Sequence, residues 1–110
     1  MSGTLIIIPA DMSKPVQVEP RDRQPELSEL HDIVGGYIEA VPHWSHHNGE
    51  PCVAFCNEEG KLAVHGREPL PINDRATMMW WNVLGGRPPD GDTLVGNVVL
   101  MVNLPDEEEE

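Results

Sequence analysis

Positive charge is scarce in this chain, which has seven lysines and arginines against nineteen aspartates and glutamates and a net charge of −12. A surface of this sign repels phosphate backbones and anionic lipids, so we expect no nucleic acid and no membrane among its partners. Five of the negative charges lie in residues 106–110, which we interpret as a solvated acidic tail. The alternative is a ligand for a basic partner, with Glu107 and Glu108 as contacts.

Cysteine is scarce as well, because only Cys52 and Cys56 are present. They are four residues apart in a segment with the composition of a strand, which would place them on one face about 13 Å apart at ~3.3 Å per residue. A disulfide requires Cα atoms about 4.4–6.8 Å apart, and two thiolates bind one zinc ion at ~2.3 Å each. The spacing therefore predicts neither a disulfide nor a shared zinc ion.

Long apolar runs are missing, since none approaches the ~20 residues that cross a bilayer. Residues 1–4 also lack the basic start of a secretory signal. We therefore expect a cytosolic protein with reduced thiols.

Signatures of catalysis are missing too. The chain has no G-x-S-x-G sequence, and on an extended chain Ser45 would point away from its neighbours His46 and His47. The pairs Gly35-Gly36 and Gly85-Gly86 follow apolar helical stripes, so we interpret them as helix stops and not as phosphate-binding loops. We expect a protein that is not an enzyme and that needs no cofactor.

One segment keeps a metal-dependent enzyme open as a weaker alternative. Residues 43–56 contain three histidines and both cysteines, which are ligand types that zinc accepts. The spacing favours histidines in a polar loop and cysteines on a strand. A single-metal site that uses His43, His46 and Cys52 is the remaining alternative.

Apolar patterning predicts an α+β fold in a single domain of residues 1–105. Continuous apolar runs at 4–8 and 98–102 are typical of strands buried on both faces, and therefore central in a sheet. Shorter patterns predict further strands at 16–19, 37–41 and 52–56, with a short continuation at 62–64. We expect the first two strands to form a hairpin, and 37–41 to pair with 52–56.

Two segments have the apolar period of a helix. The first ends at Gly35, and the second begins at a cap formed by Asn73 or Asp74 and ends at Gly85. The element order is then β-β-α-β-β-α-β. We predict a mixed sheet of the β-grasp type with both helices on one face.

The second predicted helix has more apolar residues than one stripe requires. The stripe at helical spacing consists of Ala76, Met79, Trp80 and Val83. Met78 and Trp81 lie off it and are apolar too. Either the helix is ordinary core with a neighbouring loop over Trp81, or it offers a contact surface to a homodimer or another protein, for which Met and Trp are favoured anchors.

The chain contains four distinctive short segments: Gly35-Gly36-Tyr37-Ile38-Glu39, Asn57-Glu58-Glu59-Gly60-Lys61, Asn73-Asp74-Arg75-Ala76-Thr77 and Gly96-Asn97-Val98-Val99-Leu100. Together they resemble a family of small domains of unknown function from phages, prophages and bacterial mobile elements. The resemblance covers most of residues 4–102. It implies a small α/β protein that works in the host bacterial cytoplasm, and it brings no catalytic residue.

These observations predict a small non-enzymatic phage accessory protein that binds a host or phage protein. Its candidate contacts are Met78, Trp80 and Trp81. The alternative function is the sequestration of a small molecule or nucleotide, as an antidefence factor would do. For an anionic ligand, Arg67, Arg75 and Arg87 would have to form a local basic pocket.

Overall fold

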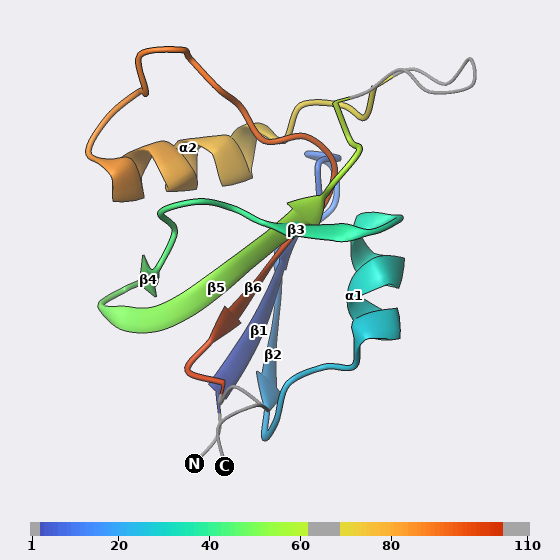
Figure 1. Ribbon diagram of the computed structural model, residues 1–110. Coiled ribbons are helices and arrows are strands. Elements are labelled where there is room, and N and C mark those ends of the chain that lie inside the picture. Colours follow the sequence, from blue (N-terminus) through green and yellow to red (C-terminus); the bar gives the residue numbers. More distant parts are fainter. Residues whose placement is uncertain (1–2, 62–68, 105–110) are drawn as a thin grey trace.

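The computed structural model describes residues 3–61 and 69–104, which form one sheet and two helices (Figure 1). The strands are Gly3–Ile8 (β1), Gln17–Arg21 (β2), Ile38–Ala40 (β3), His46–His47 (β4), Glu50–Asn57 (β5) and Val98–Val102 (β6). The helices are Leu27–Val34 (α1) and Asp74–Leu84 (α2). The predicted α+β architecture is therefore confirmed.

The sheet has the strand order β2-β1-β6-β5-β3, and β4 pairs with the start of β5. β1 and β6 lie at its centre, paired from Thr4↔Val102 to Ile8↔Val98. All five residues of β6 are buried, because both of its faces are covered. The central positions predicted for these two strands are confirmed, as are the β1–β2 hairpin and the pairing of β3 with β5.

The strand directions differ from the prediction. Every pairing between the described strands is antiparallel, so the predicted mixed sheet is wrong, and with it the basis for a β-grasp type is lost. A parallel central pair would need a connection that runs the length of the sheet before β6. Instead α2 lies at the end of the sheet that β5 reaches, and the chain enters β6 from that same end (Figure 1).

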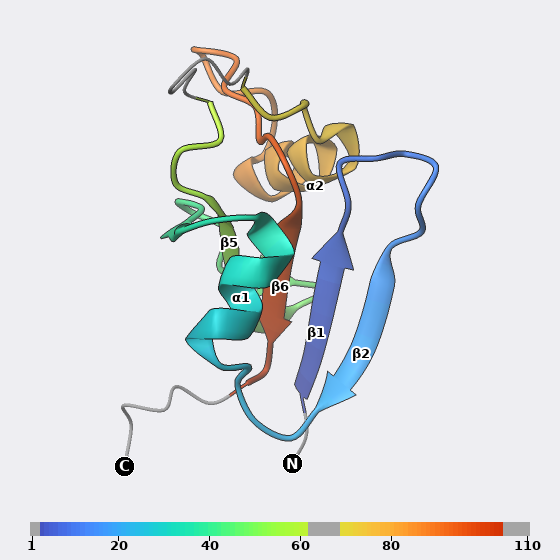
Figure 2. The same cartoon turned by 90° about the vertical axis from the view of Figure 1, so that its right-hand side faces the viewer.

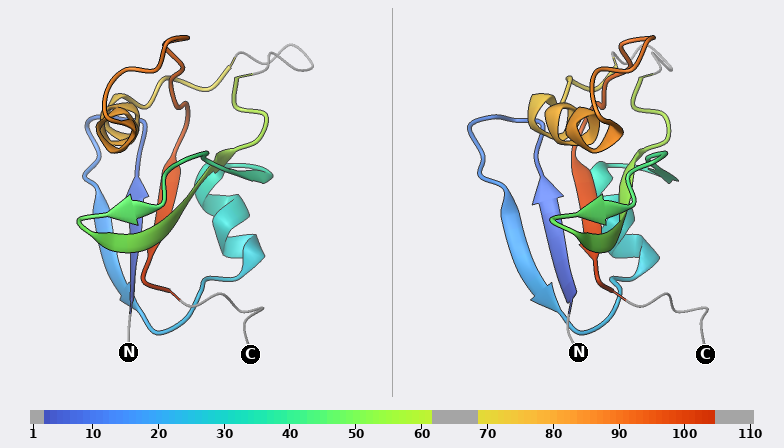
Figure 3. Two further views of the ribbon diagram at one scale, coloured as in Figure 1. Left: turned by 60° about the vertical axis from the view of Figure 1, so that its left-hand side comes forward. Right: turned by 90° about the vertical axis from the view of Figure 1, so that its left-hand side faces the viewer.

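The two helices lie on opposite faces of the sheet, so the prediction of one shared face is also wrong (Figures 2 and 3). Alternate residues of β6 show the division. Val99 and Met101 share a buried cluster with Leu30 of α1, whereas Val98 and Leu100 share one with Trp80 of α2. A strand that is apolar at every position has two faces to cover; α1 covers one of them, and α2 together with Val41 and Trp44 covers the other.

The helix ends agree with the sequence. Gly35 and Gly85 follow α1 and α2 in the left-handed conformation, with φ of 82° and 89°. The segment predicted as a polar loop contains the additional strand β4, so the element order has one more strand than predicted. The strand predicted at 62–64 and the tail at 106–110 lie outside the described residues.

Candidate functional site

Asn73 begins α2 and is fully buried. Its Oδ1 accepts a hydrogen bond from the amide of Ala76 at 2.9 Å, which makes Asn73 the N-cap. Its Nδ2 donates to the carbonyl oxygens of Ile8 and Gly96, both at 2.8 Å. One side chain therefore joins the start of α2 to the end of β1 and to the turn before β6.

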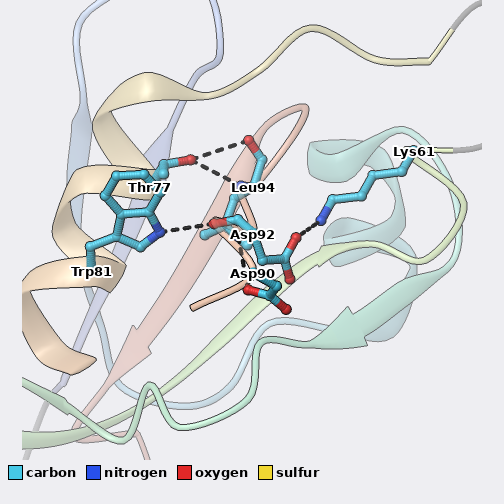
Figure 4. A network of polar contacts seen from close by, with 6 residues as sticks. All are labelled: Lys61, Thr77, Trp81, Asp90, Asp92 and Leu94. Atoms are coloured by element: carbon cyan, nitrogen blue, oxygen red, sulfur yellow. Dashed lines mark hydrogen bonds and ion pairs between the residues drawn. The ribbon is translucent and has the colours of Figure 1, made fainter. Parts of the chain in front are cut away.

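Two further residues of the same motif bind backbone. The Oγ1 of Thr77 accepts from the amide of Leu94 at 2.9 Å and donates to the carbonyl of that residue at 3.4 Å (Figure 4). Arg75 donates to the carbonyl oxygens of Pro9 and Asp11 at 2.8 and 3.1 Å. The motif at 73–77 therefore holds three chain segments together.

Two other asparagines secure the end of α1. Asn57 donates to the carbonyl of Val34 at 3.1 Å, and Asn97 donates to the carbonyl of Ile33 at 3.0 Å. Each thereby satisfies a carbonyl that the last turn of a helix leaves free. Asn97 also accepts from the amide of Ala10 at 3.0 Å. Asn57, Asn73 and Asn97 come from three of the four distinctive segments. The described contacts of all three build the fold.

The three predicted contact residues of α2 differ in their surroundings. Trp80 is buried in the core, and its indole N–H donates to the carbonyl of Pro42 at 2.9 Å. The indole of Trp81 donates to the carbonyl of Asp92 at 2.8 Å (Figure 4). The Arg87 guanidinium lies 5.8 Å from the ring centre of Trp81. Met78 is 62% exposed. Trp81 is thus partly covered by the loop that follows α2, whereas Met78 is open to contact.

Two hollows lie along the outer side of α2. One, of about 440 Å³, is lined by Met78, Met79, Trp81, Asn82, Gly85, Gly86 and Arg87. The other, of about 320 Å³, is lined by Trp44, His46, His47, Asn48, Met79, Asn82 and Val83. We call the surface made by these two sets the α2 face. Its described residues include no aspartate or glutamate.

The α2 face brings together residues that are far apart in the sequence. β4 lies on the same side of the sheet as α2 (Figure 3). His46 and His47 of β4 therefore border the helix at Asn82 and Val83. The sequence indicated His46 and His47 as loop residues, with His46 also a candidate metal ligand. Nothing in their local pattern points to α2, because the approach depends on the pairing of β4 with β5.

The candidate metal ligands are not brought together. Cys52 is buried, with its Sγ 3.8 Å from the carbonyl of Trp44, whereas His43 and His46 are exposed. Within residues 3–61 and 69–104, no three His, Cys, Asp or Glu side chains are placed to hold a metal ion. Glu107 and Glu108 lie outside that part of the chain.

The two cysteines lie on β5 as free thiols. Burial raises the pKa of Cys52, and it raises the pKa of Cys56 to about 11 with a contribution from the negative charge of Glu39. Since the thiolate is the nucleophile, neither cysteine is activated at neutral pH.

Residues 3–110 match the family of domains of unknown function DUF3846, and the chain belongs to that family. No curated protein and no solved structure shows a significant match to it. Neither described helix has the length and apolar character required to cross a membrane.

Proposed function

We propose that this DUF3846 domain acts by binding a protein partner through the α2 face, and not by catalysis. The main support is Met78, which is 62% exposed one helical turn after Asp74, beside two hollows whose lining residues include no carboxylate. On a chain with a net charge of −12, such a surface is a local exception. Protein interfaces are enriched in Met, Trp and Arg and depleted of Asp and Glu.

The α2 face also has a firm base. Asn73 and Thr77 attach the start of the helix to neighbouring segments, and the indole of Trp81 is held by Asp92. Anchors that are already ordered lose less conformational entropy when a partner binds. This favours a surface that is preformed for contact.

The resemblance to domains of phages and mobile elements supports an accessory role in a bacterial host cytoplasm. The partner is then a host or phage protein. A homodimer is the other outcome, and the charge of −12 on each copy opposes it through mutual repulsion. We therefore place a foreign protein first.

Nucleotide sequestration has less support. The basic pocket that it needs would combine Arg67, Arg75 and Arg87. Arg75 is engaged by backbone carbonyls, Arg87 lies over Trp81, and Arg67 is outside the described residues. A metal-dependent reaction at His43 and His46 has no gathered ligand set in its favour within the described chain.

The test compares two methionines of nearly equal exposure. Met78 is 62% exposed on α2, and Met12 is 60% exposed in the turn between β1 and β2. In affinity capture from host lysate, Met78→Glu is expected to lose a partner that wild type retains, while Met12→Glu keeps it. Sedimentation velocity of the same three proteins tests self-association.

Circular dichroism should show the same fold in all three proteins. Equal capture by wild type and Met78→Glu, with equal sedimentation, would contradict the proposal. If Met78→Glu and Met12→Glu lost the partner equally, capture would depend on the overall charge and polarity of the surface and not on the α2 face. That result would contradict the proposal too.

A further inference from the structure

A separate cavity lies where the end of β5 meets β3, α2 and the segment that leads into β6. Its volume is about 310 Å³, at the small end of the range for sites that bind small molecules. Its lining residues are Glu39, Ala40, Val41, Pro42, Cys56, Asn57, Glu58, Lys61, Trp80, Asp92, Leu94 and Val95. None of them belongs to the α2 face.

The inner wall of the cavity is apolar and fixed. Val41, Trp80, Leu94 and Val95 are buried at relative exposures of 8% or less. Trp80 is held by its hydrogen bond to Pro42, and Leu94 is held by Thr77. A wall of this kind is preformed and offers an apolar ligand a surface without a large ordering cost.

The rim of the cavity is acidic. Glu39, Glu58 and Asp92 contribute carboxylates, and Lys61 contributes one ammonium group. Lys61 forms an ion pair with Asp92 (Figure 4), whereas Glu39 and Glu58 have no ion pair among the described residues. Within residues 3–61 and 69–104, two carboxylates of the rim therefore have no paired countercharge.

The state of Cys56 agrees with a negative local field. Its pKa is raised first by burial and then by Glu39, with a smaller increase from Asp92 that Lys61 opposes. The contributions of Glu39 and Asp92 are those of a negative field, which disfavours phosphate and carboxylate ligands and favours a positive charge, whereas the burial contribution disfavours a charge of either sign.

We propose that this cavity binds a small organic cation, with a short apolar body against Trp80 and Leu94 and an ammonium group near Glu39 and Glu58. The ligand class is thus an amine or a quaternary ammonium compound, and not a nucleotide. This site is independent of the protein contact on the α2 face, and each can fail without the other.

The experiment uses three probes with one phenyl body and different charge. These are phenethylamine, 2-phenylethanol and phenylacetate, added to ¹⁵N-labelled full-length protein and followed by NMR. Phenethylamine is expected to shift the signals of Glu39, Cys56 and the Trp80 indole, and to bind about tenfold more tightly than phenylacetate. Added salt should weaken phenethylamine binding.

Single substitutions locate the charge. Glu39→Gln and Glu58→Gln are each expected to weaken phenethylamine binding several-fold. Glu50→Gln serves as the matched control, because Glu50 is also exposed but lies at the opposite end of β5. All three sites are on the surface, so the dispersed NMR spectrum of the fold should persist.

Three results would overturn the proposal: equal affinity for the three probes, shifts that lie away from the cavity, or no saturable shift with phenethylamine. If Glu50→Gln weakened phenethylamine binding as much as Glu39→Gln and Glu58→Gln, the overall charge of the protein would explain the loss. That result would overturn the proposal as well.

Discussion

The two helices of this domain are attached to the fold in different ways. In α1, Leu30 and Val34 are buried against the sheet, and its one strongly exposed large apolar residue, Leu27, is followed by Ser28 and Glu29. In α2, the apolar residues continue around to the outer side, where Met78 is exposed. α1 therefore exposes a single large apolar residue beside polar neighbours, whereas α2 exposes two, Met78 and Val83.

The polar contacts of the helices show the same contrast. The end of α1 is secured by Asn57 and Asn97, which are supplied by other segments. The start of α2 is secured by its own Asn73 and Thr77, which reach out to β1 and to the segment before β6. When a helix is attached to the fold through its first turn, the side chains on its outer side are not needed for that attachment.

The largest effect is expected at the start of α2. Asn73→Ala removes the cap and leaves the Ile8 and Gly96 carbonyls without their described partner in a fully buried place. We expect a loss of roughly 3–5 kcal/mol in the free energy of unfolding, measured by urea denaturation. Asn82→Ala, at an exposed site of the same helix, should leave stability unchanged or slightly higher.

If Asn73→Ala and Asn82→Ala cost the same, α2 would not be fixed by its first turn. The proposed difference, in which α2 is attached by its own first turn and α1 by residues of other segments, would then be wrong.

An intermediate effect is expected when both helix stops are changed in the same way. Gly35 and Gly85 have positive φ, and a Cβ added at either would meet nothing within 4 Å. Gly35→Ala and Gly85→Ala should therefore each cost only the backbone strain, about 1–2 kcal/mol. Thermal or urea unfolding would measure both. A much larger loss at one site would show that its helix end is packed and not merely capped.

The smallest effect concerns the contact of α1 with β2. Arg21 makes two hydrogen bonds to the Glu29 carboxylate, at 3.1 and 2.5 Å, and it lowers the pKa of Glu29 below its ordinary value. This contribution is complete above the ordinary carboxyl pKa, and it is lost as pH falls through the lowered folded value. Because the Glu29 side chain is 38% exposed, the contribution is below about 1 kcal/mol.

Between pH 7 and pH 3, the free energy of unfolding should therefore fall less steeply with pH in Glu29→Gln than in wild type. Glu26→Gln, an exposed neighbour with no described ion pair, should follow the wild-type curve. If the free energy of unfolding had the same pH dependence in wild type and in Glu29→Gln, the ion pair of Arg21 with Glu29 would not stabilise α1.

The local parts of the fold were predictable from the sequence. Gly35 and Gly85 were correctly predicted as helix stops, and the cap of α2 is Asn73, one of the two residues that the sequence indicated, because each of these features depends on a few neighbouring residues. The two central strands were predictable from their continuous apolar runs. The direction of β6 was not, because it depends on where a long connection returns, and no residue in that connection encodes the end of the sheet.

The candidate surfaces were predictable only in part. Met78 stands out in the helical pattern, and its exposure agrees with that pattern. Trp80 is as apolar as Trp81, and only the tertiary fold separates the buried ring from the half-covered one. The cavity beside Glu39 was not predictable, because its lining residues come from separate strands, a helix and two loops.

The pairing of β1 with β6 also determines when this protein can fold. Thr4 meets Val102 across almost the whole described chain, so the central contact has a very high sequence separation. Such contacts form slowly, because a long loop must close first. Until β6 has been translated, β1 has only β2 as a neighbouring strand, and a lone hairpin is marginal in water. A chain that stalls before β6 would therefore be a target for chaperones and proteases, and the folded domain would form in one late step.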